Sequence, residues 1–87
     1  MTVKKMTIEA ANGLHARPAG ELVKLVKSFP GTSVSIATPA KKVSASSILS
    51  ILSLGLKKGT GIEISAEGPD EERAVEEIVI FLGGLEV

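Results

Sequence analysis

His15 is the single histidine of the 87-residue chain, and Arg17 and Pro18 follow it closely. Asn12-Gly13 interrupts the preceding pattern, and Pro18 suits the first turn of a helix, where a missing backbone N–H costs nothing. We therefore expect His15 at or beside a helix N-terminus, where free N–H groups form an anion site. The guanidinium of Arg17 would add a charge-assisted pair of donors in the same turn.

This arrangement suits covalent phosphoryl transfer through histidine. The positive helix end disfavours protonation of the imidazole, so more of it is neutral and nucleophilic near neutral pH. Once His15 carries a phosphoryl group, the same N–H groups and Arg17 would hold its oxygens. On spacing alone, the alternative is a surface histidine at a helix cap.

The composition narrows the classes of function. Lys and Arg number 10, as do Asp and Glu, so no net basic charge favours binding to a nucleic-acid backbone. The chain has no cysteine, and one histidine without suitably spaced carboxylates makes no zinc site, so neither a metal nor another cofactor is expected. Without an apolar run of signal-peptide or membrane-spanning length, we expect a cytoplasmic protein that does not insert into membranes.

Periodicity predicts the elements that position this segment within one domain, residues 1–87. Apolar residues alternate in predicted strands and recur every three or four residues in predicted helices, around an aliphatic core because aromatics are only 2% of the chain. The strands are expected over 6–10, 33–38, 41–44 and 62–67, one helix over 16–29, and another from its expected cap Asp70 to Gly83-Gly84.

A short apolar stretch, 47–54, is expected to form a third helix. Ser47 makes a good N-cap, and Gly55 suits the position after the helix. Ile51 and Leu54 are expected to face the sheet, so the remaining apolar side chains could form an exposed contact surface, with ordinary core as the alternative. Those side chains are Ile48, Leu49 and Leu52. The order β-α-β-β-α-β-α, with helices on one face, indicates an α+β open-faced β-sandwich.

The run Gly-Leu-His-Ala-Arg-Pro-Ala at 13–19 resembles the active-site motif of HPr, the histidine-containing phosphocarrier family of the bacterial sugar phosphotransferase system. The run 47–55 resembles the regulatory region of that family, and the strand 64–68 also fits. The resemblance covers essentially the whole chain. It implies a four-stranded antiparallel sheet of order 1-4-2-3 covered by three helices, and we expect a monomer.

The resemblance also implies roles for the residues of the first motif. His15 would accept a phosphoryl group on Nδ1 from Enzyme I, which takes it from phosphoenolpyruvate, and would pass it to Enzyme IIA domains for sugar uptake. Arg17 would stabilise the group, with Ala16 and Pro18 as supporting residues. Such a carrier turns over only with partner enzymes and is not an autonomous enzyme. The alternative output is a regulatory or nitrogen-related phosphorelay.

For the second motif, the resemblance implies phosphorylation of Ser47 by an HPr kinase/phosphorylase and a transcriptional regulator as a further partner. A phosphate there would place about two negative charges beside the apolar patch and weaken docking without touching His15. The alternative for Ser47 is a plain N-cap. The residues expected to bind partners are Ile48, Leu49, Leu52, Gly20 and Lys24. Gly20, Leu49, Ser50 and Leu52 depart from common family residues.

Two other classes of function fit the sequence poorly. A nucleic-acid-binding α+β domain usually presents aromatic platforms and a basic face, whereas this chain is neutral with two phenylalanines. A hydrolase that uses His15 would need a nucleophile, a base and an orienting group, and no such set accompanies it.

Overall fold

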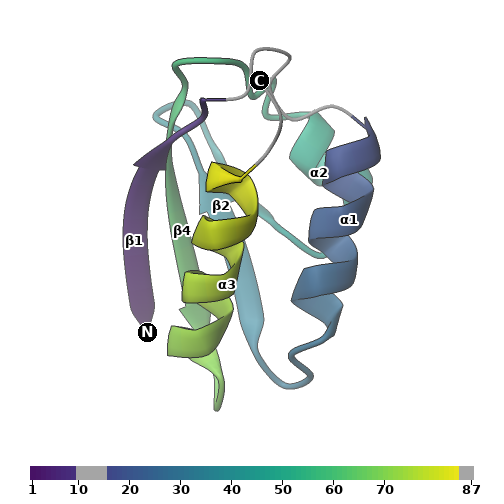
Figure 1. The fold of residues 1–87 in the computed structure, drawn as a ribbon, viewed down its shortest axis with the longest axis vertical. Helices are drawn as coiled ribbons and strands as arrows, with labels where there is room; N and C mark the ends of the chain where they lie inside the picture. The colour runs from purple at the N-terminus through teal and green to yellow at the C-terminus, as the bar shows by residue number, and fades with distance from the viewer. Residues whose placement is uncertain (10–15, 85–87) are drawn as a thin grey trace.

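The computed structural model describes residues 1–9 and 16–84. Four strands form one antiparallel sheet in the order β1-β4-β2-β3, and three helices cover one of its faces (Figure 1). The predicted open-faced β-sandwich and its strand order are therefore confirmed. The elements are β1 (Thr2–Thr7), α1 (Ala16–Lys27), β2 (Ser33–Ala37), β3 (Lys42–Ser44), α2 (Ile48–Leu52), β4 (Gly61–Glu67) and α3 (Glu71–Gly83).

The core lies between the helices and the covered face of the sheet. Alternate residues of the central strands β4 and β2 point into it, and one stripe of α1 packs against them, as the helical spacing predicts. The buried apolar residues of these three elements are Ile62, Ile64, Ala66, Val34, Ile36, Ala19, Leu22, Val23 and Val26. The core is thus aliphatic at its centre, and Phe29 closes it beyond the end of α1.

The first strand is the largest error in the predicted boundaries. The alternation from Met6 to Ala10 predicted a strand there, but β1 runs over Thr2–Thr7, and Ala10 lies outside the described residues. β1 is an edge strand whose residues pair with β4 from Thr2 to Thr7, although most of their side chains are exposed. Backbone pairing defines this strand. Its side chains therefore show little of the apolar–polar alternation from which strands were predicted.

Two helices also differ from prediction at their ends. α1 ends at Lys27 rather than at Phe29, because Phe29 N–H donates to the Val26 carbonyl, three residues back instead of the four of an α-helix. Phe29 is nevertheless buried. Asp70 occupies the N-cap position of α3, as predicted, but its side chain makes no capping hydrogen bond. Its N–H donates instead to Thr32 Oγ1 at 3.2 Å.

Glu71, the first residue of α3, makes several side-chain contacts at this end of the helix. Its Oε1 accepts from Gly68 N–H at 3.3 Å, and its Oε2 accepts from Thr2 Oγ1 at 2.8 Å and from the Met1 amine at 2.9 Å. The hydrogen bond from the amine is the main cause that lowers the pKa of this carboxyl. Glu71 thereby ties the beginning of α3 to the beginning of β1.

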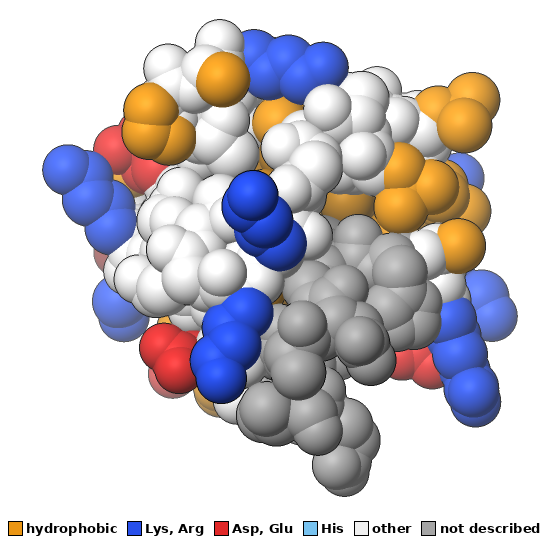
Figure 2. Space-filling model, turned by 90° about the horizontal axis from the view of Figure 1, so that it is seen from above, with side chains coloured by type: hydrophobic (Ala, Val, Ile, Leu, Met, Phe, Trp, Pro, Cys, Tyr) orange, Lys and Arg blue, Asp and Glu red, His pale blue; other side chains and the backbone are white. Residues whose placement is uncertain are grey.

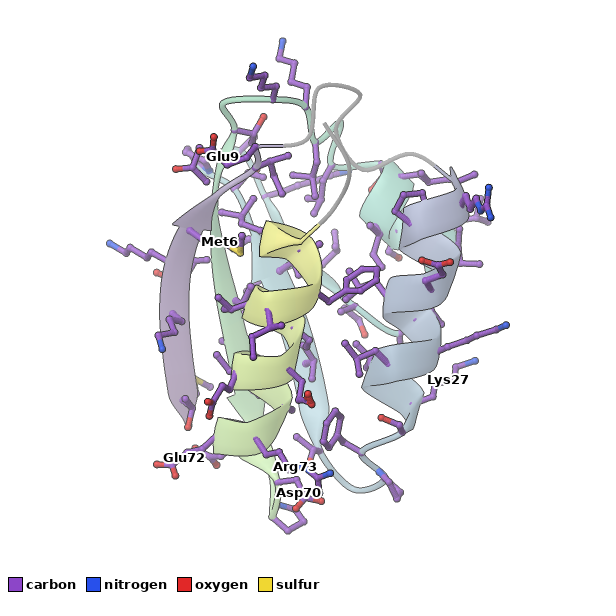
Figure 3. All side chains as sticks on the ribbon, viewed as in Figure 1. Met6, Glu9, Lys27, Asp70, Glu72 and Arg73 are labelled. Atoms are coloured by element: carbon purple, nitrogen blue, oxygen red, sulfur yellow. The ribbon has the colours of Figure 1, made fainter. Side chains whose placement is uncertain are left out.

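The turn between β4 and α3 packs closely on the turn between α1 and β2. Gly68 has a φ of +148°, and a Cβ there would lie 2.6 Å from the Gly31 carbonyl oxygen and from Thr32 Cα. Arg73, at the same end of α3, lies over the Phe29 ring at 5.6 Å from its centroid (Figure 3). These contacts fix the end of the molecule opposite the beginning of α1 (Figure 1).

Candidate functional site

The first predicted motif coincides with the beginning of α1. The helix begins at Ala16, so His15 directly precedes it, but His15 lies outside the described residues. Ala16 and Arg17 are exposed and Pro18 is half-buried. The first turn contains no acidic side chain, so nothing there offsets the positive helix end. An anion bound at this end could therefore be held by backbone N–H groups and by the guanidinium of Arg17.

The second predicted motif coincides with α2. Ser47 is its N-cap: Ser47 Oγ accepts from Ser50 N–H at 3.3 Å, and the Ser47 carbonyl accepts from Ile51 N–H at 3.1 Å. The predicted N-cap is confirmed. The predicted end of the helix is not, because α2 stops at Leu52 with Ser53 as its C-cap, and Gly55, whose φ is +63°, lies three residues beyond the helix. Ser46, by contrast, is exposed and bonds to Ser44 Oγ at 2.8 Å.

The apolar side chains of α2 divide between core and surface. Ile51 is fully buried, as predicted, whereas Leu49 is 80% exposed and Ile48 is 41% exposed. Leu52 and Leu54 are partly buried and pack against the core. Ordinary core therefore does not describe Ile48 and Leu49. Hydrophobic side chains gather at this end of the molecule beside the grey residues (Figure 2).

Helices α1 and α2 meet at Gly20. A Cβ at Gly20 would lie 3.8 Å from Ile48 Cδ1, an ordinary van der Waals distance, so this position has room for one methyl group. Lys24 lies one turn further along the same face of α1 and is exposed. The contact between Gly20 and Ile48 therefore brings α1 and α2 together. The five predicted partner-binding residues lie on these two helices and are here called the α1–α2 face: Gly20, Lys24, Ile48, Leu49 and Leu52.

The charges of the chain are separated along the sequence, a feature that the zero net charge concealed. Nine of the ten Lys and Arg residues lie in the first 60 residues, and eight of the ten Asp and Glu residues lie in the last 27. The acidic residues therefore concentrate on β4 and α3, while α1 and the turn before β4 carry cations. Lys57 and Lys58 lie in that turn and are exposed. Figure 2 shows Lys and Arg side chains beside the grey residues.

A hollow of about 570 Å³ lies elsewhere on the described residues. It is lined by residues of β1, β4 and the end of β2, among them Lys5, Gly61 and Glu63. The predicted site residues that the structure describes do not line it. Within residues 1–9 and 16–84, no three His, Cys, Asp or Glu side chains come together as a metal site. The described helices include none that is long and apolar enough to cross a membrane.

Comparisons with known proteins agree on one family. The family model described as PTS HPr component phosphorylation site matches residues 2–83. Phosphocarrier protein HPr of Vibrio cholerae is 42% identical over 85 residues, which are 98% of this chain and 99% of that protein. The Haemophilus influenzae protein of the same name is 41% identical over 86 residues, covering 99% and 100% of the two chains.

Solved structures give the same result. HPr-C-His from Thermoanaerobacter tengcongensis has a TM-score of 0.91 and 37% identity, with full coverage of both chains. Crh, the Bacillus subtilis catabolite repression protein, has a TM-score of 0.77 and 31% identity, covering 100% of this chain and 99% of that one. That structure is described as a dimer formed by a swapped domain.

Proposed function

The chain belongs to the HPr family of phosphocarrier proteins of the phosphotransferase system, and from that premise we propose that His15 is the residue that carries the phosphoryl group. The observation that carries this proposal is the position of the only histidine. It lies within the matched residues 2–83 and directly precedes α1, whose first turn contains Arg17.

The transfer that we propose forms an N–P bond at His15 while the bond that holds the phosphoryl group on Enzyme I breaks. The lone pair of His15 Nδ1 attacks the phosphorus of phosphorylated Enzyme I, and the electron pair of the broken bond stays with the Enzyme I group that carried the phosphoryl group. The first N–H groups of α1 and the guanidinium of Arg17 stabilise the oxygens of the transferred group. In the second transfer, a nucleophile of an Enzyme IIA domain attacks the phosphorus on His15, and the electron pair of the broken N–P bond returns to the His15 imidazole.

Enzyme I and the Enzyme IIA domains are proposed to dock on the α1–α2 face. Leu49 and Ile48 supply exposed apolar area next to the beginning of α1, and Lys24 and Arg17 supply positive charge around it. A partner surface with an apolar centre and an acidic rim fits this pattern. The proposal places the chain in the cytoplasm, where phosphoenolpyruvate is formed, and its action as a monomer stays a prediction.

Incubation with Enzyme I and phosphoenolpyruvate tests the proposed carrier role. The chain is expected to gain one phosphoryl group that is lost in acid and retained in alkali, as N-linked phosphate is. Mass spectrometry under alkaline conditions should locate it on the peptide that contains His15. A chain that gains no phosphate, or gains one that survives acid, contradicts the proposal.

We also propose that Ser47 is the site of regulatory phosphorylation by an HPr kinase/phosphorylase. Its Oγ already accepts a hydrogen bond from Ser50 N–H, and a phosphate ester there would add acceptors at the same N-terminus. The exposed side chains of Ile48 and Leu49 follow it directly, so the added charge would disfavour burial of these side chains by a partner or a transcriptional regulator.

Incubation with an HPr kinase and ATP tests this assignment, and Ser46 provides the matched control. An acid-stable phosphate is expected on the wild-type chain and on Ser46→Ala, but not on Ser47→Ala. Measured docking to Enzyme I should weaken after modification. Labelling that persists in Ser47→Ala and disappears in Ser46→Ala would assign the site to the neighbouring serine.

A further inference from the structure

β1 forms one edge of the sheet. It pairs with β4 from Thr2 to Thr7 on one side, and no strand among the described residues pairs with its other side (Figure 1). β3 forms the opposite edge, but it has three residues where β1 has six. A free edge presents unpaired backbone groups to which another extended strand can bond. β1 is therefore the longer of the two edges at which this sheet could be extended.

The hydrogen bonds of Ile8, which directly follows β1, show which backbone groups face the free edge. Ile8 N–H donates to the Thr60 carbonyl at 2.9 Å, and the Ile8 carbonyl accepts from Gly59 N–H at 2.7 Å, so both groups of Ile8 point toward the β4 side. In an antiparallel pair this direction alternates from one residue to the next. The N–H and carbonyl groups that point outward therefore belong to Val3, Lys5 and Thr7.

The two lysines of β1 lie on different faces of the sheet. Lys4 is opposite Ile64, which is fully buried beneath the helices, whereas Lys5 is opposite Glu63. Because residues directly opposite each other share a face, Lys4 lies on the helix-covered face and Lys5 on the uncovered one. Both lysines are exposed, and no ion pair joins Lys5 to Glu63. The charge of Lys5 is thus available at the free edge.

A second copy of the chain is the partner whose strand we compare with this edge. Two β1 strands related by a two-fold axis would pair antiparallel, each residue with one on the same face, and the four strands of each copy would join into one continuous sheet. The registers that pair most of β1 are centred on Lys5 or on Lys4. The first exchanges hydrogen bonds between three outward-pointing pairs, Lys5 with Lys5 and Val3 with Thr7 twice. The second has only two such pairs, both of Val3 with Lys5.

We propose that Lys5 prevents the free edge of β1 from pairing with the same edge of a second copy. In the register with more hydrogen bonds, the two Lys5 side chains would lie directly opposite each other, where like charges are destabilising. The remaining pairs on that face, Val3 with Thr7, are β-branched and suit a sheet. In the other register, Lys4 would face its own copy and fewer bonds would form. This inference is independent of the proposed role of His15.

The variant Lys5→Thr tests the proposal by replacing the two opposed ammonium groups with a Thr–Thr pair. Its dimer dissociation constant, measured by sedimentation equilibrium up to millimolar concentration, is expected to be at least about tenfold lower than that of the wild-type chain. A wild-type chain that dimerises as tightly as Lys5→Thr overturns the inference.

Lys4→Thr is the matched control. It makes the same substitution in the neighbouring residue and the same change in net charge, but in the register centred on Lys5 it lies opposite Met6. Lys5 would still face its own copy there, so the dissociation constant should change much less than in Lys5→Thr. Equal tightening in the two variants would show that position 5 has no special part in keeping the edge free.

The variant Lys5→Glu separates charge from side-chain shape. Alone, it should stay as monomeric as the wild type, because two carboxylates would then face each other. Mixed with the wild-type chain, it should form a heterodimer in which Glu lies opposite Lys5, seen as slower tumbling of ¹⁵N-labelled wild-type chain when unlabelled variant is added. A mixture that associates no more than either chain alone overturns the inference.

Amide hydrogen exchange locates the interface. The Val3 and Thr7 amides point outward and are expected to exchange fast in the wild type, whereas the Met6 amide points toward β4 and is expected to be protected. In the Lys5→Thr dimer, the Val3 and Thr7 amides should become protected as well. A Lys5→Thr dimer in which these two amides still exchange fast uses another surface and overturns the inference.

Discussion

The His15→Ala variant is expected to accept no acid-labile phosphate from Enzyme I, even at long incubation times. The chain contains one histidine and no cysteine, so it has no second imidazole or thiol that could take the phosphoryl group in the same way. Arg17 and the N–H groups of α1 can stabilise a phosphoryl group but cannot bond to it covalently. The loss should therefore be complete rather than a reduction in rate, when measured as incorporated phosphate per chain.

The comparison needs a variant that keeps the docking surface and the nucleophile. Ser47→Ala removes the proposed regulatory hydroxyl on α2 and should be labelled by Enzyme I to the same extent as the wild type. His15→Ala should still compete with the wild-type chain for Enzyme I, because the α1–α2 face contains no histidine. Acid-labile phosphate on His15→Ala would require another acceptor and would refute the assignment.

Gly68→Ala is expected to lower the free energy of unfolding by about 3 kcal/mol or more. Two costs combine at this position. The φ of +148° lies in a region that residues with a side chain rarely adopt, and an added Cβ would lie 2.6 Å from the Gly31 carbonyl oxygen and from Thr32 Cα. Both neighbours are backbone atoms, which cannot rotate away, so the turns before β2 and before α3 would have to separate.

Gly61→Ala is the control for this prediction. Gly61 begins the same strand that Gly68 follows, but a Cβ there would meet no atom within 4 Å, and its φ is not positive. Urea denaturation of both variants should show a large fall in the midpoint for Gly68→Ala and a change of about 0.5 kcal/mol or less for Gly61→Ala. Equal midpoints for the two variants would mean that the contact between the two turns relaxes at little cost.

The sequence predicted most reliably those features that one local pattern determines. The helical stripe of α1 follows from the spacing of Leu22, Val23 and Val26, all of which are buried. The cap at Ser47 follows from residue type at a helix N-terminus, and it is present. In each case, the residues whose type or spacing predicts the feature are the same residues that form it in the structure.

Features that depend on distant parts of the chain were missed. β1 is defined by pairing with β4, so the exposed side chains of Lys4 and Lys5 gave no sign of it. At α3, the Glu71 side chain bonds to Gly68 and Thr2 while that of Asp70 makes no cap, because the strand beside the helix supplies partners that no local rule contains.

The candidate site shows the same division. The sequence predicted that His15 lies beside a helix N-terminus with Arg17 in the first turn, and α1 begins at Ala16, directly after His15. The packing of Gly20 against Ile48 could not be predicted, because two strands separate the two helices in the sequence and only the fold brings them together.

The contact between Gly20 and Ile48 determines what kind of recognition this protein permits. The surface that it joins comes from two segments separated by two strands, so a partner that docks there as proposed would recognise a three-dimensional arrangement and not a continuous stretch of sequence. A synthetic peptide that copies residues 16–27 would lack Leu49, and one that copies residues 47–55 would be too short to hold a helix in water. Inhibitors of docking should therefore be sought among folded scaffolds that present both helices, and an antibody raised against either peptide would be a poor reporter of the native face.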